Sequence, residues 1–303
     1  MTVPRAVLLD TDVGTDVDDA IAIALLAAAP ELDLRAVTVV SGDTAHRARI
    51  AKKLLALGGR PEVPVAPGVR EPVLRQRNFL WVGHEGEAIL APGEVIPLSA
   101  AHAVDLLIDT VQREHPHIVA IGPLSNLAVA IMKEPAVITS IPHLTVMGGN
   151  LRRDPAVPLV DYNLGSDAEA ALVVLNAGIP TTLVPLDTTR KVFFTRAEVE
   201  RLRRSRSRLV LTLCDAIEIW ATLQHALSYF QPDAVAYLHD PLTLALLLEP
   251  SLVTLERLRL RPAIADGLFQ LVPDSEAPEF EVATAVDAPR FVEFLLDRLL
   301  RLA

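Results

Sequence analysis

Residues 6–29 read AVLLDTDVGTDVDDAIAIALLAAA and decide the fold. The four apolar residues at 6–9 are followed at once by an aspartate, which is typical of a short, buried strand. The apolar run from Ala20 to Ala29 has the composition of a buried helix, and Asp18 and Asp19 stand where acidic side chains suit the unpaired N–H groups of a helix start. A buried strand that leads directly into a helix predicts the first unit of a parallel α/β sheet.

The same alternation of strands and helices continues along the chain. Further strands are expected at 36–40, 118–121, 144–147, 181–184, 253–260, 268–272 and 280–284, and helices at 45–57, 101–112, 126–133, 168–176 and 290–302. We therefore predict an α/β protein with an open, mostly parallel sheet flanked by helices in a Rossmann-like arrangement, and a helical C-terminal part. Residues 1–303 are expected to form a single domain. Residues 61–97 are rich in Pro and Gly and are expected to form a long connection that overhangs the site.

Composition narrows the classes of partner. Of the 303 residues 51% are hydrophobic, the formal net charge is -10, and the basic residues are scattered apart from a run at 201–208. These features argue against nucleic acid as a partner. The only cysteine, Cys214, gives neither a disulfide framework nor a metal finger, which fits a cytoplasmic location. We expect a leaderless chain that does not interact with a membrane.

Five aspartates fall within ten residues, at positions 10, 12, 16, 18 and 19. Like charges this close repel one another unless a cation or a hydrogen-bond network compensates them. An Asp-rich turn with a helix cap would explain one or two of the five, but not all. Oxygen ligands favour calcium or magnesium over zinc, and calcium is preferred if substrate hydroxyls complete a larger coordination shell. The residues therefore predict a cation site at the end of the first strand.

Six segments in order resemble the inosine-uridine nucleoside hydrolase family over nearly the whole chain. They are DTDVGTDVDDA at 10–20, VTVVSGD at 37–43, AIGPLSNLA at 120–128, VMGG at 146–149, DYNLGSDAEAA at 161–171 and LHDPL at 238–242. Each segment alone is unspecific, but six in register make a specific match. The resemblance implies a calcium-dependent hydrolase that splits the N-glycosidic bond of a ribonucleoside into ribose and free base, and that assembles as a homodimer or homotetramer.

The resemblance also implies roles for individual residues. Calcium would be held by the carboxylates of Asp12, Asp19 and Asp240 and by the carbonyl oxygen of Ile121. The ribose 2'-hydroxyl would contact Asp18, and Asp10 would support the cluster. The substrate-binding set would further include Asp43, His84, Met147, Asp161 and Asn163, with Asn163 on the ribose hydroxyls.

Cleavage builds positive charge on the sugar, so the site needs an activated water on one face and help for the departing base on the other. Asp12 is the expected general base for that water. His239, beside Asp240, resembles the family histidine that protonates the leaving base. His84 is expected to be either a second group near the base or a plain loop residue.

Several positions depart from the family pattern. Five residues instead of three separate Asp12 from Asp18, and the insertion contains Asp16, expected as a solvated turn residue rather than a substitute ligand. Asp43 stands where the family has Asn and would add a negative charge near the ion. Asp161 replaces a Glu expected at the ribose 5'-hydroxyl, and Asp154 and Pro155 stand near the place of another family Asn. The sequence therefore leaves open whether the substrate is modified at the ribose 5' position.

These motifs do not indicate which base the protein prefers. Aromatic and histidine side chains on a helical stretch near the base either contact the base or pack against other helices, with packing favoured for two of them, Trp220 and Phe230; the others are His225 and Tyr229. Two other functions share some of these features. A haloacid dehalogenase-like phosphatase also begins with Asp-x-Asp after a strand, but Gly14 stands where its signature needs Thr or Val. A nucleoside or ribose binder without turnover would not need a group such as His239.

Overall fold

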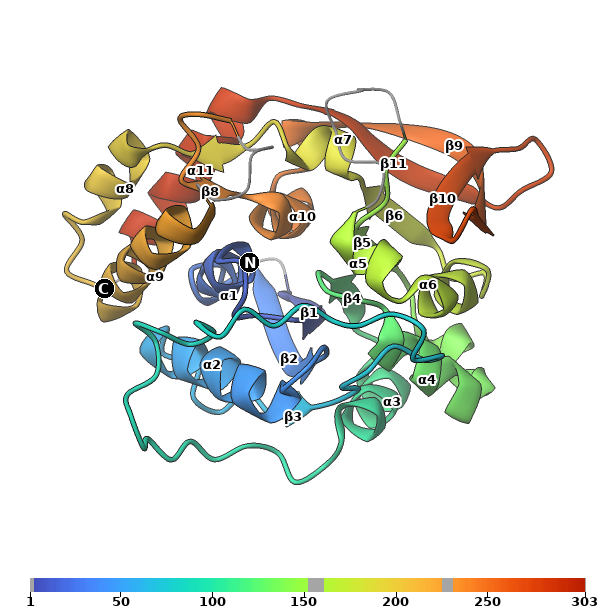
Figure 1. The fold of residues 1–303 in the computed structure, drawn as a ribbon, viewed down its shortest axis with the longest axis horizontal. Helices are drawn as coiled ribbons and strands as arrows, with labels where there is room; N and C mark the ends of the chain where they lie inside the picture. The colour runs from blue at the N-terminus through green and yellow to red at the C-terminus, as the bar shows by residue number, and fades with distance from the viewer. Residues whose placement is uncertain (1–2, 152–160, 225–230, 303) are drawn as a thin grey trace.

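Strand β1 (Arg5–Thr11) lies inside the sheet and leads into the aspartate-rich segment (Figure 1). The computed structural model describes residues 3–151, 161–224 and 231–302, and within these ranges the chain forms a nine-stranded sheet in the order β10-β9-β11-β6-β5-β4-β1-β2-β3. Its other strands are β2 (Leu32–Val39), β3 (Val65–Pro67), β4 (His117–Ala120), β5 (Leu144–Met147), β6 (Thr181–Val184), β9 (Val253–Ala265), β10 (Leu268–Pro273) and β11 (Glu279–Val286). The strands from β3 to β11 in this order pair in parallel, and β9 and β10 pair antiparallel at one edge.

The helices fill the connections between the strands. They are α1 (Asp18–Ala27), α2 (Thr44–Leu57), α3 (Ala103–Glu114), α4 (Ser125–Lys133), α5 (Tyr162–Ser166), α6 (Ala168–Leu175), α7 (Leu186–Thr189), α8 (Arg196–Leu202), α9 (Arg208–Gln224), α10 (His239–Leu248) and α11 (Ala288–Leu300), with 3-10 turns at Pro135–Ser140 and Pro250–Leu252. A separate antiparallel pair, β7 (Phe193–Phe194) and β8 (Ala236–Tyr237), leads from α7 to α8 and into α10.

Two apolar layers cover the sheet, and β1 contributes to both. Val7 and Leu9 pack with α1, α2, α9, α10 and α11, whereas Leu8 packs with α3, α4 and α6. Successive side chains of a strand point to opposite faces, so the continuous apolar run AVLL is what a strand covered on both faces requires. Figure 1 shows α3, α4 and α6 on one side of the sheet and α1 and α9 on the other.

The predicted fold class is confirmed. The strands expected at 144–147 and 181–184 have the observed bounds, and the final helix starts two residues earlier than predicted. Strand β3 was not predicted, because three residues inside a segment rich in Pro and Gly carry no readable period. The helix predicted from Ala20 begins at Asp18, so both acids belong to its first turn.

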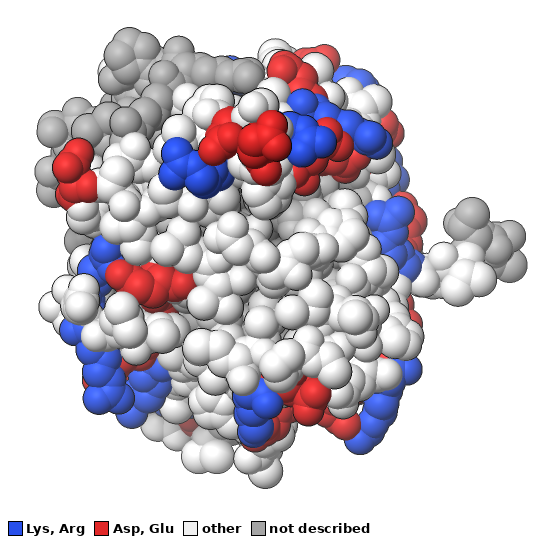
Figure 2. All heavy atoms as spheres, turned by 90° about the vertical axis from the view of Figure 1, so that its right-hand side faces the viewer, with Lys and Arg blue, Asp and Glu red and all other residues white. Residues whose placement is uncertain are grey.

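Charged side chains of both signs are interspersed on the face shown in Figure 2, with a broad uncharged area between them. In the parts of the chain that are described, no helix is long and apolar enough to cross a membrane.

Candidate active site

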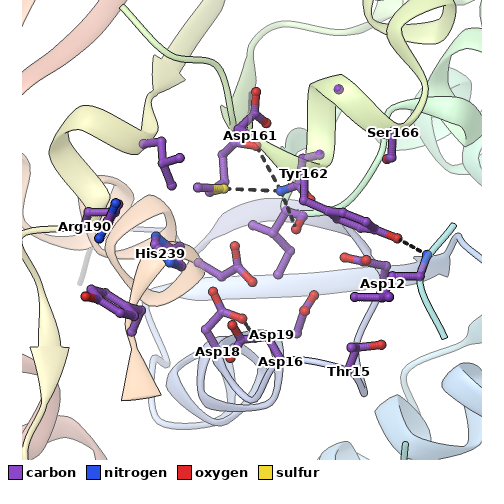
Figure 3. A pocket seen from close by; sticks show the side chains of 18 of the residues that line it. Asp12, Thr15, Asp16, Asp18, Asp19, Asp161, Tyr162, Ser166, Arg190 and His239 are labelled. Atoms are coloured by element: carbon purple, nitrogen blue, oxygen red, sulfur yellow. Dashed lines mark hydrogen bonds between the residues drawn. The ribbon is translucent and has the colours of Figure 1, made fainter. Parts of the chain in front are cut away.

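A cavity of about 830 Å³ opens where the carboxyl ends of β1, β4 and β5 meet. Parallel strands end at a common edge, and ligands of open α/β sheets bind there. Figure 3 shows the acidic side chains gathered at the base of the cavity, with Asp161 and Tyr162 above them and His239 and Arg190 to one side. Its lining comprises Asp12, Thr15, Asp16, Asp18, Asp19, Arg77, Asn78, Leu80, Ile121, Met147, Asp161, Tyr162, Asn163, Gly165, Ser166, Leu186, Arg190, Trp220, Tyr237, His239 and Asp240.

Three buried carboxylates form the tightest group of acids in the cavity. Asp18 and Asp19 lie in the first turn of α1 and Asp240 in the first turn of α10, and one oxygen from each lies within 4.8 Å of the others. Burial is the largest cause that raises the pKa of all three well above the usual value, and the neighbouring acids add to it. Three such carboxyls are costly to ionise without a countercharge, and an all-oxygen donor set fits a hard divalent cation such as calcium or magnesium.

Asp12 follows β1 directly and lines the same cavity, but it lies outside this group of three. Its carboxylate packs against Gly122, where an added Cβ would lie 2.9 Å from Asp12 Oδ1 and 2.9 Å from its backbone nitrogen. Only glycine leaves room for this approach. Burial raises the pKa of Asp12 to about 6, while the charge of Arg47 acts in the opposite direction.

Asp16 is not the solvated turn residue that we expected. Its side chain is half-buried, lines the cavity and accepts a hydrogen bond from the Val17 N–H at 2.6 Å. Burial, with repulsion from Asp19 and Asp12, raises its pKa to about 7. The two additional residues of the segment between Asp12 and Asp18 thus place a further acid inside the cavity, which the turn propensity of Asp did not indicate.

Asp10 lies behind the cavity, within β1. Its Oδ1 accepts hydrogen bonds from the Thr38 hydroxyl at 2.5 Å and from the Asn126 amide at 2.8 Å. Asn126 also accepts from the Val69 N–H and thereby links α4 to the chain beyond β3. Asp10 therefore holds neighbouring elements together behind the acids that face the cavity.

Asn163 connects two strand ends at the cavity. Its amide nitrogen donates to the carbonyl oxygen of Ile121 at 3.0 Å and to that of Met147 at 3.1 Å. The Ile121 N–H in turn donates to the Asp10 carbonyl. The carbonyl oxygen that was predicted as a metal ligand is thus held by a residue that was predicted to bind the sugar, and a carbonyl has a second lone pair for a cation.

Asp161 caps α5, and its Oδ1 accepts from the Leu164 N–H at 2.9 Å. Burial raises its pKa to about 6, against hydrogen bonds from several backbone N–H groups. The carboxylate lines the cavity, but helix capping occupies part of its hydrogen-bonding capacity.

His239 lines the cavity beside Asp240. Its Nδ1 lies 2.7 Å from the Thr189 hydroxyl, and its ring stacks on Tyr237 with 5.3 Å between ring centroids. Burial, assisted by the charge of Arg190, lowers the pKa of His239 to about 3. The ring is therefore neutral near pH 7 in this state of the site.

Two predicted substrate-binding residues are not brought into the cavity. Asp43 is exposed and caps α2, where its Oδ1 accepts from the His46 N–H at 3.1 Å. His84 stacks on Trp220 with 6.0 Å between centroids, and its Nε2 lies 2.8 Å from the Thr15 carbonyl oxygen. Neither Asp43 nor His84 belongs to the lining.

The structure also places side chains in the cavity that sequence reasoning missed. Arg77, Asn78 and Leu80 come from the long connection that was expected to overhang the site, and their contact with the cavity confirms that expectation. No motif marks them, because loops carry no period. Trp220 lines the cavity, whereas the remaining residues that the sequence placed near the base or the 5' end lie outside the described residues: Asp154, Pro155, His225, Tyr229 and Phe230.

The fold and the site define an α/β protein with a carboxylate-rich ligand cavity at the carboxyl edge of its sheet. A family model described as inosine-uridine preferring nucleoside hydrolase matches residues 7–293. The chain therefore belongs to this family.

Relatives of this chain differ in the base that their names mention. An inosine-uridine preferring nucleoside hydrolase from Leishmania major is 28% identical over 318 residues, covering 99% of this chain and 98% of that protein. A pyrimidine-specific ribonucleoside hydrolase from Citrobacter koseri is 31% identical over 312 residues, covering 97% of each. Among solved structures, a plant nucleoside hydrolase superposes with a TM-score of 0.86 at 29% identity, covering 99% of this chain and 100% of that one. A purine-preferring ribonucleoside hydrolase from Gardnerella vaginalis gives 0.84 at 25% identity, covering 98% and 99%.

Proposed function

We propose that this chain uses calcium to hydrolyse the N-glycosidic bond of ribonucleosides, giving ribose and free base. Members of this family are N-ribosyl hydrolases, and so is this chain. The calcium ion and the role of each residue are our proposal. The observation that carries it is the group of three buried carboxylates, Asp18, Asp19 and Asp240, at the base of a cavity that can hold a nucleoside.

The donor set fits calcium. Asp12, Asp19 and Asp240 would hold the ion together with the carbonyl oxygen of Ile121, and Asp18 would contact the ribose 2'-hydroxyl. The close approach of Asp18 to the other two acids makes Asp18 the alternative to Asp12 in the metal shell. When bound, the ion would neutralise the acids, polarise a water and hold the sugar diol.

The remaining chemistry falls to side chains of the cavity. Asp12 would accept the proton of the attacking water, and Asn163 would orient the sugar while it holds the Ile121 carbonyl. His239 would assist the departing base as a neutral ring: its Nδ1 faces the Thr189 hydroxyl, so its Nε2–H would be the donor to the base, on the side of the cavity that it shares with Tyr237. Met147 and Asp161 would complete the part of the cavity that binds the ribose.

A panel of ribosides tests the proposal. Purine, pyrimidine and 5'-modified ribosides are incubated with calcium or after chelation, and the release of reducing sugar is measured. We expect release with calcium and loss of release after chelation. No sugar from any riboside in calcium would overturn the proposal, and tight nucleoside binding without release of free base would instead identify a binder. The phosphatase alternative is not retained, because the family match covers residues 7–293.

Three further expectations belong to this proposal. Residues 1–303 would form a single domain, the chain would assemble as a homodimer or homotetramer, and it would act in the cytoplasm. Sedimentation equilibrium would measure the assembly, and a mass equal to one chain would contradict it.

A further inference from the structure

A fully buried arginine joins the two segments that border the cavity near Asp12. Arg47, on α2, is 0% exposed. We call residues 12–17 the acid loop and residues 77–85 the cover segment. The guanidinium of Arg47 donates to atoms of both, and neither the sequence motifs nor the family likeness drew attention to it.

All the acceptors of Arg47 are oxygens of the backbone or of a hydroxyl. Its Nε donates to the Ser41 carbonyl at 2.9 Å, and its Nη1 to the carbonyl of Asp12 and, at 3.1 Å, to that of Val13. Its Nη2 donates to the Thr15 hydroxyl at 2.9 Å and to the Leu80 carbonyl at 3.3 Å. The fixed fork of a guanidinium can reach both sides at once, which an ammonium group cannot.

The two segments are also joined to each other around this arginine. The Thr15 hydroxyl donates to Glu85 at 2.9 Å, and Glu85 accepts from the N–H groups of Val82 and Gly83 at 2.8 and 2.7 Å. His84 donates from Nε2 to the Thr15 carbonyl, because a carbonyl oxygen only accepts. Thr15 lies in the segment between Asp12 and Asp18, so this segment contacts the cover segment through both its hydroxyl and its carbonyl.

The space around Arg47 is closed on two further sides. The ring of Trp81 lies over the guanidinium, 5.2 Å from its central carbon. Gly14 has a φ of +132°, and a Cβ there would lie 2.9 Å from Ile50 and 3.4 Å from Arg47 Nη1. Arg47 is fully buried and donates to acceptors in both segments. The acid loop therefore has little freedom to move independently of the cover segment.

We propose that Arg47 is a positioning residue, which holds the backbone of Asp12 and Val13 and ties the acid loop to the cover segment. Burying a cation is expensive unless its hydrogen bonds are satisfied, and here they are satisfied by the atoms that determine where Asp12 lies. Its effect on turnover rests on the proposed function, whereas its effect on the two loops does not.

Arg47→Lys is the discriminating variant, since it keeps the charge and removes the fork. Hydrogen exchange should become faster in residues 13–16 and 80–83 together. The kcat for ribonucleosides should fall about 10- to 100-fold, the range found when groups that orient metal ligands are lost, with KM changed less. Arg60→Lys is the matched control, because Arg60 also donates to backbone carbonyls, those of Ala29 and Leu32, and these belong neither to the acid loop nor to the cover segment.

Each result has a separate meaning. Unchanged exchange in either segment of folded Arg47→Lys would overturn the proposal, and so would an unchanged kcat in an active enzyme. A wild-type chain without turnover would refute the proposed function, and hydrogen exchange would still decide the role of Arg47.

If Arg47→Lys does not fold, Thr15→Val takes its place, because it removes the hydroxyl between Arg47 and Glu85. We expect faster exchange in both segments and about a fivefold loss of kcat, which is part of the effect of the full network; unchanged exchange in this variant would overturn the proposal.

Discussion

Ionisable side chains cluster at both edges of the central sheet, buried where the strands end and half-buried where they begin. At the carboxyl edge, Asp18, Asp19 and Asp240 crowd together and burial raises their pKa values. At the amino edge, the half-buried rings of His117 and His143 lie next to each other, tilted by 36° and with 4.9 Å between ring centroids. The two imidazoles avoid mutual repulsion by staying neutral, whereas the acids repel one another when they ionise.

The histidines at the amino edge have partners within the fold. His117 Nε2 lies 2.8 Å from the Thr145 hydroxyl, and His143 Nε2 lies 2.8 Å from that of Thr182. Burial lowers the pKa of both, that of His117 to about 3, so they are neutral at pH 7. The amino edge satisfies its polar groups within the fold, whereas the crowded acids of the carboxyl edge could hold a metal ion. Five experiments test this difference.

The largest effect is expected from removing an acid of the carboxyl edge. Asp12→Asn should lower kcat about a thousandfold, since general acid and base groups contribute about 10²–10⁴. Asp240→Asn should abolish turnover as well, because it removes a carboxylate from the proposed metal shell. The measurement is release of reducing sugar in calcium. Asp287→Asn is the control, because Asp287 caps α11 away from the cavity and Asn caps as well. Full activity of either acid variant would refute its role.

A smaller effect is expected for His239→Ala, and it should depend on the leaving group. Natural bases leave poorly without a proton, so kcat for them should fall about 100-fold. A p-nitrophenyl riboside, whose phenolate leaves unaided, should be affected less than about fivefold by the same reasoning. Equal losses for both substrates would show that His239 does not assist the leaving base.

Calcium binding should be visible in thermal stability. At about 100 times its Kd, calcium should stabilise the fold by about 2.7 kcal/mol and raise Tm by about 5 °C or more. Asp12→Asn should reduce this shift more than Asp18→Asn does. The reverse order would assign Asp18 to the metal shell, and a wild-type Tm that ignores calcium would remove the basis for the cation site.

The amino edge should respond to acid. The folded state keeps the pKa of His117 at about 3, below the ordinary 6.5. As the pH falls, the unfolded chain therefore binds a proton at His117 before the folded chain does. The contribution of His117 to the free energy of unfolding is complete above pH 6.5 and is lost as the pH falls toward 3, at about 1.4 kcal/mol per pH unit. Urea unfolding between pH 7 and 5 should show a smaller pH dependence in His117→Gln, with turnover at pH 7 retained. If the free energy of unfolding of His117→Gln depended on pH as strongly as that of the wild type, His117 would not be the group responsible.

The smallest effect is expected at Asp43. Asp43→Asn should change kcat/KM by less than about twofold, because the residue is exposed and Asn caps a helix as well as Asp does. A larger change in the riboside assay would restore the role near the ion that the sequence suggested.

The sequence alone determined the alternation of strands and helices, because buried strands and helices differ in length and period. The resemblance of its motifs to the family further implied that Asp240 would join the acids after β1. Asp240 follows β8, which lies in the separate antiparallel pair, so the order of the parallel strands does not by itself place it there. The alternation of strands and helices is a local inference. The residues at 144–147 and 181–184 are therefore found where the pattern put them.

Only the tertiary structure decided which side chains face the cavity. Asp16 and Asp43 are both loop aspartates in sequence, yet one lines the cavity and the other caps a helix at the surface. Arg47 looks like any basic residue of α2, and its five acceptors lie between 6 and 35 positions away along the chain. Such contacts depend on where distant loops pack, and no local propensity or period encodes that.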